Sequence, residues 1–271
     1  MESVHLEDRA VIALTGAEAR GLLQGLITND IEKVAPGRGI YAALLTPQGK
    51  VVSDFLITEG DGALLLDCPA AAAELLLKKL KLYRLRAKVE IEARPQLAVF
   101  AGLTELPSRA ALRAITFADP RLAALGPRSI GALAEMPDFL PGAAAYHATR
   151  LMLGVPEGAD FGSDRIFALD AGLDELHGVA FDKGCYVGQE LTARMKHRGT
   201  ARKRLLTVEA DDALPPPGSE IRDDGSVLGE ITSTYGAKGF ALIRLDRLEQ
   251  AQGTLKADAM AVRLTRPAWL G

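Results

Sequence analysis

The chain has 271 residues, 48% of them hydrophobic and 25% charged, with a formal net charge of −3 at pH 7. These values are typical of a globular protein and give no global attraction to nucleic acid or to anionic membranes. No apolar run reaches the ~20 residues of a membrane-spanning helix, and the acidic start Met1–Asp8 lacks the apolar stretch of a secretory signal. Two cysteines cannot form a disulfide framework. We therefore expect a reduced, cytoplasmic location and no membrane partner.

The first half of the chain mixes strand-like and helix-like patterns, which predicts an α+β domain. Thr15 and Glu18 have the spacing of a capping box, which predicts a helix start. Thr46-Pro47-Gln48-Gly49 predicts a tight turn, because proline presets φ and glycine permits a positive φ. Residues 120–142 predict only loops and short elements. The expected strands are residues 4–14, 40–45, 51–58, 63–68, 88–93, 96–101 and 114–118, and the expected helices are residues 17–26, 70–83 and 143–153.

The composition changes after residue 204, where short strand-like runs follow one another. Pro215-Pro216-Pro217-Gly218 is a rigid break, and Asp223-Asp224-Gly225 predicts a hairpin turn. Several short strands within about seventy residues indicate a small β-barrel. We predict an α+β domain with antiparallel sheet and helices over residues 1–200 and a C-terminal β-barrel domain over residues 201–271, linked by residues 190–203. The expected barrel strands are residues 227–235, 239–245 and 260–265.

The motif Lys183-Gly184-Cys185-Tyr186-Val187-Gly188-Gln189-Glu190 is the strongest functional signal. A thiol acts as a nucleophile or metal ligand only as a thiolate, and a cation such as Lys183 lowers its pKa. A small buried cysteine between ordinary turns is the alternative, and both remain open on these residues alone. Cys68 lies in a hydrophobic strand and is expected to be structural. The histidines have no zinc-type spacing, so no bound metal is predicted.

Several segments together resemble one known family. The string from Phe181 to Glu190, followed by Arg194 and Arg198-Gly199, resembles the signature of the YgfZ family of folate-binding proteins, as do residues 23–30 and 45–50. That family is related in fold to the T-protein of glycine cleavage, a tetrahydrofolate-dependent aminomethyltransferase. The resemblance implies an aminomethyltransferase-like domain that assembles or repairs iron–sulfur enzymes and takes part in folate-linked tRNA modification. It implies catalytic roles for Cys185 and Lys183, supported by the motif residues Gly184, Tyr186, Gly188, Gln189, Glu190 and Arg194.

The resemblance also implies a cavity for tetrahydrofolate or a derivative near Tyr41 and Asp54, which match folate-contacting positions of the related fold. Asp54 could instead be a solvent-facing strand residue. Ser53 replaces an acidic neighbour of the related enzymes, and Met152 replaces the glutamate that hydrogen-bonds the pterin. A thioether is a weak acceptor. Either another acid substitutes for that glutamate, or folate binds weakly, or the pocket holds something else.

The segment from Arg194 to Arg204 has six Lys or Arg residues in eleven positions and no acid. Such a run attracts phosphate, a polyglutamate tail or RNA, or is simply a solvated linker. Without aromatic residues it predicts no sequence-specific nucleic-acid binding. Arg194 would pair with Glu190 if the segment is helical.

The function that the resemblance implies is an accessory protein whose partners are iron–sulfur enzymes or assembly factors and folate. The alternatives are an aminomethyltransferase that uses Asp54 and a non-enzymatic adaptor.

Overall fold

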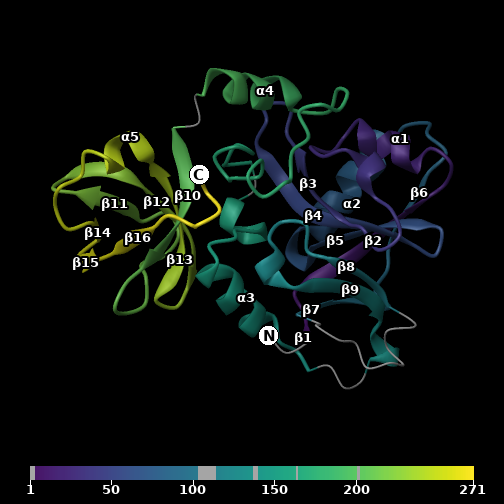
Figure 1. Ribbon diagram of the computed structural model, residues 1–271, viewed down its shortest axis with the longest axis horizontal. Coiled ribbons are helices and arrows are strands. Elements are labelled where there is room, and N and C mark those ends of the chain that lie inside the picture. Colours follow the sequence, from purple (N-terminus) through teal and green to yellow (C-terminus); the bar gives the residue numbers. More distant parts are fainter. Residues whose placement is uncertain (1–3, 103–113, 137–139, 163, 200–201) are drawn as a thin grey trace.

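The computed structural model describes residues 4–102, 114–136, 140–162, 164–199 and 202–271. In these residues the strands pair into three antiparallel sheets (Figure 1). Both faces of the five-stranded sheet are buried in hydrophobic clusters. Tyr41 and Ala43 pack into one cluster, whereas Ile40 and Ala42 pack into another on the opposite face. Its strand order is β3 (Ile40–Leu45), β4 (Val51–Gly60), β5 (Ala63–Pro69), β2 (Arg9–Thr15) and β6 (Glu90–Ala93).

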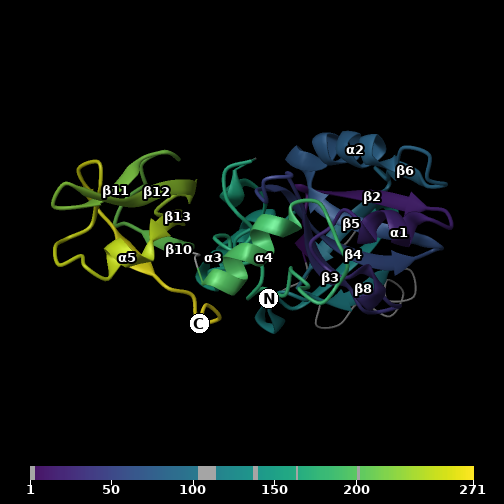
Figure 2. The ribbon, with the colours of Figure 1, turned by 90° about the horizontal axis from the view of Figure 1, so that it is seen from above.

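Two helices cover one face of this sheet. They are α1 (Ala19–Gln24) and α2 (Ala70–Arg84), and Figure 2 shows α2 on the outside of the molecule. Leu76 and Leu80 of α2 are fully buried in the same cluster as Ile40. The structure confirms the strands expected over residues 40–45, 51–58 and 63–68 and the helix expected over residues 70–83. Each strand was recognisable because its run of apolar residues is buried along its whole length.

The second sheet lies below the first in Figure 1 and joins the start of the chain to its middle. Its outermost strand, β1, ends at His5, and a turn at residues 7–8 divides the single strand expected over residues 4–14. The strand β9 lies in the stretch for which only loops and short elements were predicted. Its sequence has little apolar pattern, and its pairing with a strand on each side determines its conformation. The order is β1 (Val4–His5), β7 (Leu97–Ala101), β9 (Pro127–Ala132) and β8 (Ile115–Ala118).

One local prediction is wrong. Residue Thr15 does not cap α1: the N-cap is Glu18, whose carboxylate instead accepts from the Lys88 backbone N–H at 2.6 Å. The expected linker contains a ten-residue helix, α4 (Gln189–Arg198), which ends at Gly199 in the left-handed conformation. The remaining short elements are α3 (Ala143–Met152), α5 (Leu245–Leu248) and the 3-10 turns η1 (Ile31–Lys33), η2 (Ala123–Leu125), η3 (Leu133–Glu135) and η4 (Gly158–Phe161).

The third sheet curls into the barrel at the left of Figure 1. Ala241 and Ile243 lie in the core of the barrel itself. Phe240 and Leu242, on the opposite face of the same strand, pack into the core cluster of the N-terminal domain. The indole N–H of Trp269 donates to the Leu153 carbonyl at 3.1 Å, so the end of the chain also holds the two parts together. The order is β15 (Met260–Ala261), β14 (Lys256–Ala257), β11 (Glu220–Asp223), β12 (Ser226–Tyr235), β13 (Lys238–Arg244), β10 (Lys203–Glu209) and β16 (Arg263–Thr265).

Candidate functional site

The motif loop is anchored by its lysine. Lys183 is buried, and its ammonium donates to the backbone carbonyls of Ile27 and Asn29 at 2.7 and 2.8 Å. Burial lowers the pKa of Lys183 to about 8, and its Nζ lies 5.0 Å from the ring centre of Tyr186. The lysine thus ties the motif to residues 27–29, a segment that also carries the family resemblance. Its hydrogen bonds are those of a positioning residue; its catalytic role stays a prediction.

Gly188 fixes the other end of the loop. It precedes α4 with φ +82°, and a Cβ there would lie 2.6 Å from the Thr46 carbonyl oxygen and 2.9 Å from Leu45 Cβ. Only glycine accepts both the left-handed backbone and this close approach. The contact is reciprocal, because a Cβ on Gly49 would lie 3.3 Å from the Gly188 carbonyl oxygen. The β3–β4 hairpin, which turns at residues 46–49, and the motif lie far apart in sequence but pack against each other as one unit.

Cys185 lies between these two anchors and is exposed, whereas Cys68 is buried. Its neighbour Tyr186 is buried, and the Tyr186 backbone N–H donates to the Gln189 side-chain oxygen at 3.4 Å. Gly184 is exposed with open space around it. A fixed loop therefore presents one accessible thiol, which excludes the reading of Cys185 as a small buried packing residue.

Helix α4 extends from the motif with its cationic side chains in solvent. Glu190 and Arg194 are both exposed, and the described ion pairs do not join them, although the helix that would allow this is present. Lys196 instead donates to Asp174 at 2.8 Å and lies over the ring of Phe181 at 5.4 Å. The basic run thus begins as a helix that is tied back to the loop before the motif.

An acidic pair lies beneath this helix. The described structure leaves one oxygen of Asp174 and one of Glu175 buried without a hydrogen-bond partner. Burial and the Asp174 carboxylate raise the pKa of Glu175 to about 7, while Lys196 helps to lower the pKa of Asp174 against the effect of burial. A proton on Glu175 that is donated to Asp174 satisfies both oxygens. Sequence reasoning missed this pair, because adjacent acids in a loop carry no distinguishing pattern.

Tyr41 and Asp54, the two positions that the resemblance assigns to a folate cavity, are in contact with each other and are both fully buried. The Tyr41 hydroxyl donates to Asp54 Oδ2 at 3.2 Å, and the Gly158 N–H donates to Oδ1 at 2.9 Å. Burial raises the pKa of both side chains, although Arg9 opposes this effect at Asp54. Asp54 is therefore not a solvent-facing strand residue, and both of its oxygens are already used.

These two residues lie against different cavities. Tyr41 lines one of about 310 Å³, together with Lys33 and His177, whereas Asp54 lines another of about 200 Å³ beside Phe161. Pockets for organic ligands measure about 300–1,000 Å³. The Tyr41–Asp54 pair is thus a partition between two small spaces.

The residues present do not fit tetrahydrofolate in the arrangement that the resemblance implies. The Arg121 guanidinium covers the Tyr41 ring at 5.4 Å, and Gly178 approaches the same ring closely. Met152, at the position of the pterin-binding glutamate, is 75% exposed and lines neither cavity.

The centre of the N-terminal domain is filled by a buried ionic network. Arg121 donates to Glu157, Asp119 and the Tyr146 hydroxyl at 2.6–2.7 Å. Burial alone would raise the pKa of Glu157, but Arg121 and other arginines lower it well below its usual range. Its members lie far apart in the sequence, so no local pattern predicted it. They are Arg9, Asp67, Asp119, Arg121, Arg128, Tyr146, Arg150, Glu157 and Asp160.

The network continues into the barrel. Arg150 donates to Asp160 at 2.6 Å, and Asp160 accepts from Ser233 of β12. His147 stacks on Tyr235, with ring centres 5.6 Å apart. No three His, Cys, Asp or Glu side chains among the described residues are grouped as metal ligands.

Comparison with known proteins establishes the fold. The GCVT N-terminal domain matches residues 5–135, and the CAF17 C-terminal β-barrel domain matches residues 202–271. The crystal structure of glycine cleavage system aminomethyltransferase T from Bartonella henselae aligns with a TM-score of 0.75 over 98% of this chain and 85% of that one, at 15% identity. The protein is thus an aminomethyltransferase-like α+β domain followed by a near-closed β-barrel, as predicted.

Relatives define the family within that class. The chain is 34% identical to the human iron-sulfur cluster assembly factor IBA57, mitochondrial, over 90% of this chain and 78% of the relative. It is 31% identical to the Mus musculus protein of the same name, over 97% and 84%, respectively. A homologue from Coccidioides immitis is 35% identical over 80% of this chain. The chain belongs to the CAF17/IBA57-type family.

Two expectations are corrected by these relatives. The family is that of IBA57, a relative of YgfZ, rather than YgfZ itself. The relatives are mitochondrial by name, so the expected cytoplasmic location is wrong. The physical reason is that unpaired cysteines indicate a reducing environment and do not distinguish one reducing compartment from another.

Proposed function

We propose that this protein acts in the assembly or repair of iron–sulfur clusters, and that Cys185 is the group that meets the cluster. The observation that carries the proposal is one exposed thiol held between the buried Lys183 anchor and the Gly188 contact. The family relationship supports it, because the relatives are iron–sulfur cluster assembly factors by name.

The chemistry follows from the number of ligands. Clusters are normally held by four protein ligands, and the described residues contain no group that could supply the other three beside Cys185. The thiolate therefore supplies one ligand, and a partner protein supplies the rest. The cluster is cargo that passes through a shared site, and an exposed, fixed thiol is what a second protein can reach.

The test compares rescue of a deletion strain. Iron–sulfur enzyme activity is measured under oxidative stress after complementation with wild type, Cys185→Ala or Cys68→Ala. Cys68→Ala is the matched control, because that thiol is buried and burial raises its pKa to about 12. We expect wild type and the control to restore activity and Cys185→Ala to fail at equal protein level. Full rescue by Cys185→Ala contradicts the proposal.

Folate binding and folate-linked tRNA modification stay predictions of the resemblance. The internal hydrogen bonds of Asp54 count against an aminomethyltransferase, because that reaction would need its carboxylate at the reactive nitrogen. Titration of the purified protein with tetrahydrofolate, for wild type and Tyr41→Phe, tests the prediction. Saturable binding of tetrahydrofolate that is weaker in Tyr41→Phe would support the prediction. It would also mean that the Tyr41–Asp54 pair moves apart and joins the two cavities. The partners proposed are iron–sulfur enzymes or their assembly factors.

A further inference from the structure

Helix α2 carries leucine side chains on two opposite faces. Leu76 and Leu80 are completely buried against the five-stranded sheet. Leu75, Leu82 and Leu85 face outward and are 42, 71 and 82% exposed. The spacing of seven residues places Leu75 and Leu82 on one side of the helix, and Leu85 follows directly after its last residue. A globular helix normally buries one apolar stripe, so the second stripe needs a separate explanation.

A run of positively charged residues accompanies Leu82 and Leu85 along the chain. Six Lys or Arg residues lie within residues 78–88, and no acid lies among them. Glu74 pairs with Lys78 at 2.7 Å at one end of the run, and Glu90 follows the other end. The cations are Lys78, Lys79, Lys81, Arg84, Arg86 and Lys88. We call this surface, formed by Leu75, Leu82, Leu85 and these six cations, the α2 outer face.

Leu85, at the end of α2, has a strained backbone conformation. Leu85 has φ 48° and ψ −109°, a conformation that glycine adopts readily and leucine does not. Its side chain is also the most exposed of the three outward leucines. Arg84 and Arg86 flank it, beside a cavity of about 560 Å³ that also touches Gly16. The strained turn therefore presents a leucine to solvent next to Arg84, whose guanidinium donates to the Val89 carbonyl at 3.3 Å, and Arg86.

We propose that the α2 outer face binds the interface of an anionic lipid bilayer. Amphipathic helices that lie in a membrane interface combine exposed leucines with lysine and arginine, and the cations are attracted to anionic headgroups. Such a contact does not need a spanning helix, and among the described residues no helix is long and apolar enough to span. The exposure of the leucines was not evident from the sequence, because it is a property of the folded protein.

Other occupants fit less well. A two-fold contact with a second copy would bring six cations against six cations. RNA recognition would use stacking aromatics, whereas Tyr83, the only aromatic residue in this run, packs against the core cluster. A protein partner would need a matching groove for a convex helix, whereas a fluid bilayer adapts to it.

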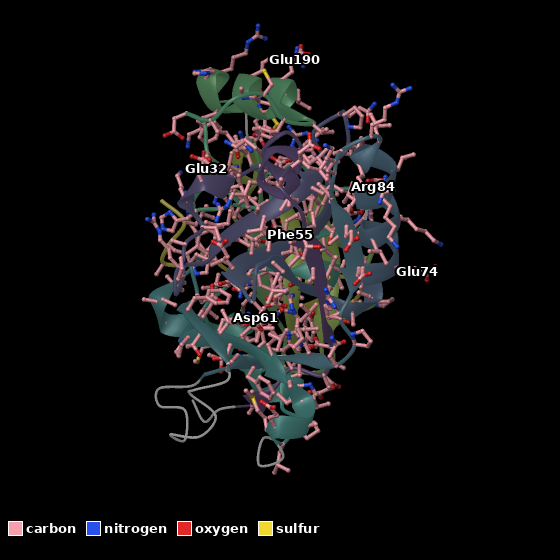
Figure 3. All side chains as sticks on the ribbon, turned by 90° about the vertical axis from the view of Figure 1, so that its right-hand side faces the viewer. Glu32, Phe55, Asp61, Glu74, Arg84 and Glu190 are labelled. Carbon is pink, nitrogen blue, oxygen red and sulfur yellow. The ribbon has the colours of Figure 1, made fainter. Side chains whose placement is uncertain are left out.

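The location of the face leaves the motif accessible. Figure 3 shows Arg84 and Glu74 along one side of the molecule, whereas Glu190 on α4 lies on another. A bilayer bound at α2 therefore does not cover the helix that follows Cys185. The protein could bind lipid and a cluster-bearing partner at the same time.

Vesicle cosedimentation of the full chain tests the proposal. The probes are vesicles of phosphatidylcholine alone and of equal parts phosphatidylcholine and phosphatidylglycerol, at low and high salt. We expect binding only to the anionic vesicles, with weakening by salt. Lys81→Glu/Arg86→Glu should weaken it at least about 25-fold, at roughly fivefold for each cation lost. Leu82→Ser/Leu85→Ser should weaken it about 100-fold or more, because two leucines no longer leave water.

The control reverses two exposed cations of the other basic run, Arg198→Glu/Arg202→Glu, which should change binding less than about twofold. Circular dichroism confirms that each variant is folded. Binding without preference for anionic vesicles, absence of binding, or equal loss in the control overturns the proposal. Unchanged binding of the leucine variant overturns it too, because the attraction is then only electrostatic. Tighter binding to an RNA homopolymer than to vesicles identifies a nucleic-acid surface instead.

Discussion

The packing of the motif on the hairpin predicts a large cost for Gly188→Ala. Alanine would have to adopt φ +82°, which costs about 1–2 kcal/mol for an L-residue. Its Cβ would also lie 2.6 Å from the Thr46 carbonyl oxygen, a backbone atom that cannot move without shifting the hairpin. Overpacking of this kind adds about 1–3 kcal/mol. We expect the free energy of unfolding to fall by about 2–5 kcal/mol.

Two other glycines separate these costs. Gly199 also has a positive φ, +57°, but a Cβ there meets nothing within 4 Å, so Gly199→Ala should show only the backbone cost of about 1–2 kcal/mol. Gly184 has open space and no positive φ, so Gly184→Ala should be neutral or slightly stabilising.

Urea unfolding measures the three free energies, and the reaction rate of Cys185 with a thiol reagent reports displacement of the loop. We expect the order Gly188→Ala, Gly199→Ala, Gly184→Ala in loss of stability, and a changed thiol reaction rate for Gly188→Ala alone. Equal losses for Gly188→Ala and Gly199→Ala would refute the argument that the hairpin contact fixes the motif.

Three further predictions concern charged side chains. Arg150→Met should lower the free energy of unfolding by about 3–5 kcal/mol, because it leaves the buried Asp160 carboxylate without its ion pair. Arg165→Ala, which breaks the exposed ion pair with Glu230 of the barrel, should cost at most about 1 kcal/mol. Similar urea midpoints for the two variants would contradict this. The folded-state pKa of Glu175, about 7, lies above its usual value of 4.5, so the contribution of this side chain to stability is lost as the pH rises from about 4.5 through 7. Glu175→Gln should therefore become more stable relative to wild type as the pH rises. A pH-independent difference between the two proteins in urea unfolding would count against a proton shared with Asp174. Lys183→Met leaves two backbone carbonyls without their donor, so it should cost about 1–3 kcal/mol in urea unfolding and speed proteolysis of the motif loop; an unchanged loop would rule out the anchoring role.

The sequence predicted those features that depend on neighbouring residues. Strand Ile40–Leu45 matches its prediction because each side chain in it is apolar and buried. The motif residues from Lys183 to Glu190 also form a continuous string, so their importance was visible. The exposure of Cys185 was not, because it depends on how Lys183 and Gly188 attach the loop to residues 27–29 and to the hairpin.

Features formed by distant residues were missed. Arg9, Arg121 and Arg150 each look like ordinary surface cations in sequence, yet each is buried with a carboxylate from another element. Strand β9 was missed for a similar reason: Pro127-Arg128-Ser129-Ile130 has no alternating pattern, and its pairing with β7 and β8 decides its conformation. Such tertiary contacts override local propensity.

The buried network limits the substitutions that the centre of this domain can accept. Arg128 pairs with Asp67 and Asp119 and bonds to Tyr146, so the loss of any one member leaves a charge or polar group of another without its partner. Removing one partner of a buried pair is far more damaging than replacing the whole pair by apolar residues. Substitutions here must therefore come in compensating sets. A lineage that enlarged this space for a new ligand would have to change an arginine and its acids together, a much rarer event than a single replacement at the exposed motif loop.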